Sequence, residues 1–151
     1  MLASRPLFTI RITLHAPYEL GATPFGQRRV IPVSGGEFEG ARLRGVVLPH
    51  AGSDWLLERG DGAFQQDARF ALQTDDGAVI LMTYRGVRHA SPEVSARLAR
   101  GEAVDPSEYY LRTAPFFETA AARYAWINQI LAVGVGRRVP GGVAYDVFEV
   151  L

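Results

Sequence analysis

Residues 45–77 constrain the fold more than any other stretch, because their apolar side chains recur at every second position between turn residues. They read GVVLPHAGSDWLLERGDGAFQQDARFALQTDDG. A period of two is typical of antiparallel strands with one buried face. Asp-Gly pairs stand at 61–62 and 76–77, where hairpin turns need residues that accept a positive φ. The stretch therefore predicts three strands joined as a meander.

Alternating segments of the same kind cover most of the remaining chain, with Gly and Pro between them. The predicted strands are residues 7–14, 28–33, 37–48, 55–58, 63–74, 78–84, 109–113, 123–135 and 143–150. We expect residues 17–26 to form a crossover, Pro32 to end its strand, and residues 34–36 to form a tight turn. One helix is predicted, from the N-cap Ser91 to a stop at Gly101.

This pattern favours an all-β fold. We predict a single antiparallel β-barrel domain over residues 1–151, with about eight to nine strands and one short helix, and a strongly curled sandwich as the alternative. A barrel of this size is either filled by side chains or holds one small ligand.

Composition excludes several classes of function. Hydrophobic residues make up 48% of the 151 residues, which is enough for a packed core, and the net charge of +0 argues against nucleic acid or an anionic membrane as a partner. The absence of cysteine excludes thiolate catalysis and cysteine zinc sites, and the absence of lysine excludes Schiff-base chemistry. With no signal sequence and no long apolar run, we expect a cytoplasmic protein.

Several predicted strands carry a face that mixes aromatic side chains with Arg, Asp or Asn, which is typical of small-molecule pockets. The candidate acid–base residues are Asp54, Asp67 and Glu118. The candidate binding residues are His50, Trp55, Arg69, Tyr110, Arg112, Tyr124, Trp126 and Asn128. Such a set predicts isomerisation, dehydration or cyclisation of a small oxygenated or aromatic carbonyl compound. Tyr and Trp also occur in strands simply because they fit a half-buried pleated surface.

Other residues receive a structural interpretation. Asp61 and Asp76 are assigned to turns, Arg85 and Arg88 to the exposed surface, and the 28–29 arginine pair is left without a role. The three histidines, at 15, 50 and 89, lack metal-ligand spacing, so we predict neither a metal nor a cofactor.

The segments LPHAGSDW, DARFALQTDDGAVI, YRGVR, EYYLRTAPFFETAAARYAWIN and AYDVFEV resemble a bacterial and fungal family. That family is catalogued as uncharacterised protein family 311, also called domain of unknown function 3237. The resemblance implies a small, calycin-like β-barrel that assembles into oligomers and has no general activity assigned to it. Where members commonly read Gly-Gly-Ala-Asp-Trp, this chain has His50 and Ser53 close to the conserved Asp-Trp core of the motif.

Two further functions stay open beside catalysis. The same lining serves a barrel that binds a small ligand without turnover. Aromatic patches such as Phe116-Phe117 also fit the interface of a homo-oligomer that has no ligand.

Overall fold

The computed structural model describes residues 1–151. Its strands are β1 (Ser4–Leu14), β2 (Tyr18–Thr23), β3 (Gly26–Glu39), β4 (Arg44–Val47), β5 (Ser53–Glu58), β6 (Phe64–Thr74), β7 (Val79–Ala90), β8 (Tyr109–Glu118), β9 (Ala132–Val139) and β10 (Gly142–Val150). Its helices are α1 (Pro92–Ala99) and the 3-10 segments η1 (Pro106–Glu108) and η2 (Ala122–Gln129). None of them combines the length and the apolar character that crossing a membrane requires.

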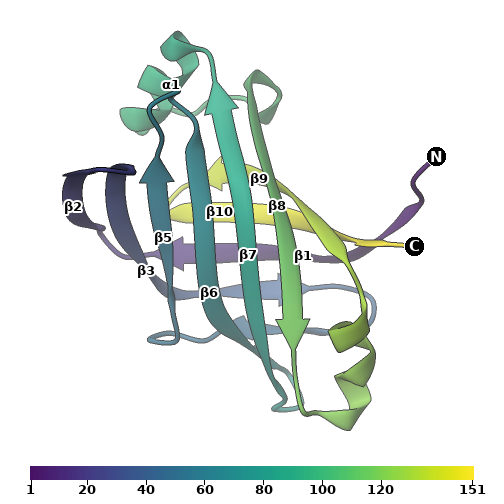
Figure 1. Ribbon diagram of the computed structural model, residues 1–151. Helices are drawn as coiled ribbons and strands as arrows, with labels where there is room; N and C mark the ends of the chain where they lie inside the picture. Colours follow the sequence, from purple (N-terminus) through teal and green to yellow (C-terminus); the bar gives the residue numbers. More distant parts are fainter.

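Eight antiparallel strands close into a barrel in the order β1-β10-β9-β8-β7-β6-β4-β3, and β3 returns to β1. β5 continues the position of β4 between β3 and β6, and β2 pairs only with β3. In Figure 1 the long strands β6, β7 and β8 run side by side, with β1 and β10 crossing behind them. The predicted all-β barrel is confirmed.

Each barrel strand points alternate side chains inward, as the period-two pattern predicts. On β6, for example, Ala68, Phe70 and Leu72 are buried while Asp67 and Arg69 are exposed. The two ends of the barrel nevertheless differ. One end is filled by packed aromatic and aliphatic side chains and closed by η2, whereas the other end lies under α1.

The predicted helix is confirmed. The Ser91 hydroxyl accepts a hydrogen bond from the Val94 backbone N–H at 3.2 Å, and Gly101 follows the helix with a φ of +76°. Both Asp-Gly turns are also present, with a positive φ at Gly62 and Gly77.

Several expectations about the strands are wrong. β2 occupies the expected crossover and forms a hairpin with β3. β3 continues through Pro32, Gly35 and Gly36, so neither the end at Pro32 nor the tight turn is present. The expected strand 37–48 is the end of β3 followed by β4, with residues 40–43 outside both. A side chain at Gly36 would put its Cβ 2.0 Å from the carbonyl oxygen of Arg11, so glycine here permits close contact with β1.

The expected strand 123–135 is also wrong. These residues form the 3-10 segment η2 followed by β9. The buried residues of η2, Tyr124 and Ile127, are three positions apart. That spacing is the period of a 3-10 helix rather than of a strand.

Candidate functional site

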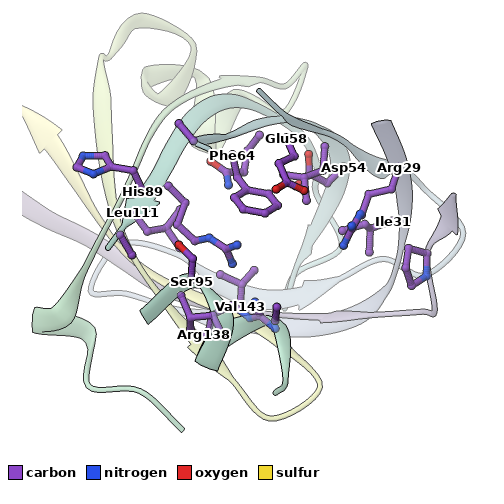
Figure 2. Close-up of a pocket in the computed structure, with 18 of the residues that line it drawn as sticks. Arg29, Ile31, Asp54, Glu58, Phe64, His89, Ser95, Leu111, Arg138 and Val143 are labelled. Carbon is purple, nitrogen blue, oxygen red and sulfur yellow. The ribbon is translucent and has the colours of Figure 1, made fainter. Parts of the chain in front are cut away.

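The end of the barrel under α1, the hollow end, contains a cavity of about 1280 Å³. Of the 30 residues that line it, 14 are hydrophobic, so the wall is mixed in character. Figure 2 shows Asp54, Glu58 and Arg29 on one wall, with Arg138 and Val143 on the opposite wall. The volume exceeds the roughly 300–1,000 Å³ of ordinary small-molecule pockets, so there is room for a ligand and water.

Strand register explains how these side chains meet. Asp54 of β5 pairs with Ile31 of β3, and Glu58 of β5 pairs with Phe64 of β6. Phe64 in turn pairs with Arg88 of β7. Directly paired residues point to the same side of a sheet, so one row of side chains continues around the barrel from β5 to β7.

Two tyrosines lie at the boundary between the cavity and the packed core. Tyr84 of β7 and Tyr145 of β10 are 4% and 2% exposed, and their ring centroids are 5.4 Å apart. Tyr84 also contacts Phe70 of the core, at 5.9 Å between centroids. Tyr145 lines the cavity itself. The pair therefore separates the hollow end from the filled end.

Asp54 is the cavity carboxylate with the most perturbed titration. Burial raises its pKa to about 6, although the hydrogen bond that its Oδ1 accepts from the Asp67 backbone N–H, at 2.9 Å, acts in the opposite direction. No arginine forms a salt bridge with it. A carboxyl group with a pKa near neutrality can accept and return a proton at physiological pH.

Arg88 is a half-buried cation without a protein carboxylate. Its guanidinium carbon lies 4.2 Å from the ring centroid of Phe64, and no salt bridge involves it. Burial, together with the positive charges of Arg138 and Arg29, lowers the pKa of Arg88 to about 10. Neither Arg88 nor Arg138 forms a salt bridge, so both guanidinium groups line the cavity without a paired carboxylate.

Gln66 supplies an unsatisfied acceptor. The residue is 6% exposed and lines the cavity, and its Oε1 has no hydrogen-bond partner. A buried carbonyl oxygen without a partner costs about 1–3 kcal/mol.

The structure separates the residues that the sequence singles out. Of the eleven candidates, Asp54 alone lines the cavity. Trp55, Asp67 and Arg69 project from the outer side of β5 and β6 and are exposed. The prediction that all eleven meet in one pocket is wrong, because the polar faces of these strands point out of the barrel.

Tyr110 and Arg112 lie in a separate shallow groove of about 640 Å³ on the outer face of β7 and β8. The Arg112 guanidinium carbon is 4.8 Å from the Tyr110 ring centroid, and His89 stacks on the same ring at 5.0 Å. His89 belongs to the lining of this groove and also to that of the cavity. Tyr110 and Arg112 therefore belong to the outer surface.

Four other candidates lie at the filled end. The Tyr124 hydroxyl donates to Asp76 at 2.9 Å, and Asn128 exchanges two hydrogen bonds with the backbone of Thr119. Trp126 packs under the Arg42 guanidinium at 3.9 Å. Glu118 is exposed at the end of β8.

His50 is exposed in the turn before β5 and has a φ of 60°. Its side chain is not among those that line the cavity. Across the whole chain, no group of three or more His, Asp or Glu side chains is arranged to hold a metal ion.

Sequence reasoning missed Arg88, Gln66 and Tyr145 and placed Arg88 on the exposed surface, which is wrong. The alternation of inward and outward positions along each strand, its parity, carries the signal that was missed. Arg88 has the same parity as buried Ile80 and Met82, and the Gln66 position has the same parity as the core residues of β6. Continuing the core face to the end of each strand would have placed both inside the barrel.

Residues 2–150 match the sequence profile of a family described as "Protein of unknown function (DUF3237)". A UPF0311 protein of Rhodopseudomonas palustris is 39% identical over 150 residues, which is 99% of this chain and 97% of the relative. A crystal structure from R. palustris, also of a protein of unknown function, is similar with a TM-score of 0.96 at 38% identity, over 100% of this chain and 99% of the other.

Two more relatives are informative. A β-barrel-like protein of Acinetobacter baumannii is similar with a TM-score of 0.87 at 39% identity, over 100% of this chain and 97% of the other. The hydroalkoxylation enzyme phnH of Penicillium herquei is 28% identical over 141 residues, which is 88% of this chain and 78% of the enzyme.

Proposed function

This chain belongs to the DUF3237 family, and we propose that it is an enzyme that moves a proton on a small oxygenated substrate, with Asp54 as the acid–base group. The observation that carries the proposal is a carboxylate whose pKa is raised to about 6 by burial in the wall of a large cavity. Protein carboxylates without a task of this kind are seldom held buried and free of a cation.

The reaction class is isomerisation, dehydration or cyclisation, and the fungal relative favours cyclisation. Hydroalkoxylation, the activity in that relative's name, adds an O–H group across a carbon–carbon double bond. The hydroxyl oxygen forms a bond to one alkene carbon and its proton passes to the other carbon, so the product is an isomer and no electrons are exchanged. A single carboxylate that first accepts and then returns the proton is sufficient for this balance.

In this mechanism Asp54 acts as the base in its ionised form, which predominates above pH 6. The hydrogen bond from the Asp67 N–H holds Oδ1, so Oδ2 is the oxygen free to face the substrate. Apolar wall residues such as Ile31 and Leu56 restrict water beside the carboxylate. Restricting water both raises the pKa of Asp54 and strengthens its interaction with the substrate.

The test uses 2′-hydroxychalcone, which closes to a flavanone by adding its phenol to an activated alkene, as a probe. We expect the protein to accelerate closure above the buffer rate and the Asp54→Asn variant to lose about 100-fold or more of that acceleration. In deuterated water the product should gain one deuterium at carbon, read by mass spectrometry. The matched control is Asp75→Asn, a change of the same chemistry at an exposed turn of the opposite end.

An Asp54→Asn variant that accelerates closure like the unsubstituted protein would overturn the acid–base role. A panel of hydroxylated alkenes and enones that bind in thermal-shift assays but never react would favour the second candidate, a barrel that only carries a ligand. The size and mixed lining of the cavity support that candidate as well. The homo-oligomer implied by the family resemblance stays a prediction.

A further inference from the structure

The cavity carries a second polar arrangement that the acid–base proposal does not use. It consists of Arg88 and Gln66, which lie on the neighbouring strands β7 and β6. Gln66 pairs with Gly86, and Arg88 follows two residues further along the same inward face of β7. Two residues along a strand span about 7 Å, so the two side chains lie within the length of one small molecule.

The glycine that pairs with Gln66 is tightly surrounded, because a Cβ built on Gly86 would stand 2.6 Å from the Thr113 Cγ2 and 2.7 Å from the Arg112 carbonyl oxygen. A Cβ built on Gly86 would stand 2.9 Å from the Gln66 Oε1, so this oxygen lies directly over the position that has no side chain. The oxygen is buried and has no partner. Because this oxygen is covered by the β7 backbone, Arg88 is the polar group of the pair that remains available to a ligand.

Arg88 has hydrogen-bond donors that lack acceptors. Its guanidinium rests on the Phe64 ring at 4.2 Å, which fixes its position without using its hydrogen-bond donors. The cavity carboxylates Asp54 and Glu58 form no salt bridge with it, although other arginines of the chain find carboxylate partners. Five unused N–H donors in a half-buried position suit a bidentate oxyanion.

We propose that Arg88 forms the recognition subsite for an organic anion and binds its charged oxygen group. This inference rests on the proposed function, because it names the class of molecule on which Asp54 acts. The charged group is a carboxylate or a phenolate, and the apolar wall between the polar ends accepts an aromatic ring.

The position of Tyr145 supports one continuous site. Burial raises the pKa of this tyrosine, and the charges of Asp54 and Arg88 both act on it, in opposite directions. Its hydroxyl therefore lies within electrostatic reach of both residues. A substrate held by Arg88 can extend across Tyr145 toward Asp54.

The experiment compares binding of four probes by isothermal titration calorimetry at pH 8. The first is 4-hydroxybenzoate; benzoate lacks its hydroxyl, 4-hydroxybenzamide lacks its charge, and 4-nitrophenolate replaces the carboxylate by a phenolate. We expect the anions to bind about 10 to 100 times more tightly than the neutral amide, as is typical of hydrogen bonds to charged groups. Which of 4-hydroxybenzoate and 4-nitrophenolate binds more tightly identifies the charged group.

Arg88→Met should abolish the preference for anions, and Arg88→Lys should restore part of it. The matched control is Arg85→Met, on the same strand but on the exposed outer face. Thermal unfolding of each variant confirms that it is folded.

Equal affinity for the acid and the amide, an anion preference that survives Arg88→Met, or no saturable binding of any probe would overturn the subsite. Asp54→Asn separates this inference from the proposed function. The anion preference should persist in that variant, whereas the acceleration of ring closure should not. The same set of proteins therefore shows whether the acid–base role fails while the anion preference remains, or the reverse.

Discussion

The filled end and the hollow end of the barrel are built from the same strands, yet they treat side chains in opposite ways. At the filled end Phe8 packs against Phe38 and Phe117, with ring centroids 5.4 Å and 5.8 Å apart. At the hollow end the corresponding inward positions hold Phe64, Arg88 and Gln66 around open space. The difference shows that stability is concentrated at one end, which leaves the other end free to hold polar groups that destabilise the fold.

The two ends also differ in the surroundings of their carboxylates. Glu149, at the filled end, is 7% exposed and bonded to Arg5 at 2.8 Å and to Arg42, and the Arg5 hydrogen bond lowers its pKa. Asp54, at the hollow end, has no such partner and its pKa is raised. A paired carboxylate stabilises a fold in its ionised form, whereas a buried unpaired one opposes it.

The largest expected effect comes from removing an aromatic ring at each end. Phe8→Ala should lower the free energy of unfolding by about 3–5 kcal/mol, because a fully packed ring leaves a cavity. Phe64→Ala should cost about 1 kcal/mol, since Phe64 is only half-buried and loses mainly its contact with Arg88. Urea unfolding of both variants measures the two losses in free energy of unfolding. Equal losses would mean that the cavity wall is as tightly packed as the core.

The next effect tests the sign of the Asp54 charge. Because its folded pKa of about 6 exceeds the ordinary 3.8, protonated Asp54 favours the fold at low pH, and this contribution is lost as the pH rises through 6. Asp54→Asn should therefore be more stable than the unsubstituted protein above pH 6, by up to about 3 kcal/mol, with little difference near pH 4. Thermal unfolding from pH 4 to pH 8 checks this. A difference that does not vary with pH would place the carboxylate in solvent.

The smallest effect has the opposite sign. The lowered pKa of Glu149 gives stability that is present above the ordinary value of 4.5 and is lost as the pH falls through the folded value. Glu149→Gln should destabilise the protein at pH 7 by about 1–2 kcal/mol, and the difference should shrink below pH 4.5. The same pH series detects it. A variant that is as stable as the original at pH 7 would show that the two arginine contacts contribute nothing.

Much of the fold was predictable because it depends on neighbouring residues. Alternation along the chain identified the strands, and the Ser91 cap and the Asp-Gly turns are local features whose chemistry is sufficient to form them. The errors fell where distant segments intervene. Nothing near Gly35 reveals that β1 lies against it, and η2 looked like a strand because its aromatic residues also fit an alternating reading.

The candidate site was less predictable. Asp54 was singled out beside Asp67 and Glu118, which are exposed, and the closure of the barrel places Asp54 in the cavity wall. The polar faces of β6 and β8 were interpreted as pocket walls, but polar and aromatic residues on a strand are equally compatible with solvent. The direction of each face follows from the core parity of its own strand.

The sequence by itself determined an all-β chain with hairpins, one short helix and a buried face on every strand, since these follow from periodicity and turn chemistry. Only the tertiary structure decided that one end of the barrel is packed and the other is hollow. That outcome depends on side-chain volumes from eight strands that meet in space. It also decided that Asp54, Arg88 and Gln66 share one cavity, because burial and unpaired charge arise only when distant segments exclude water together.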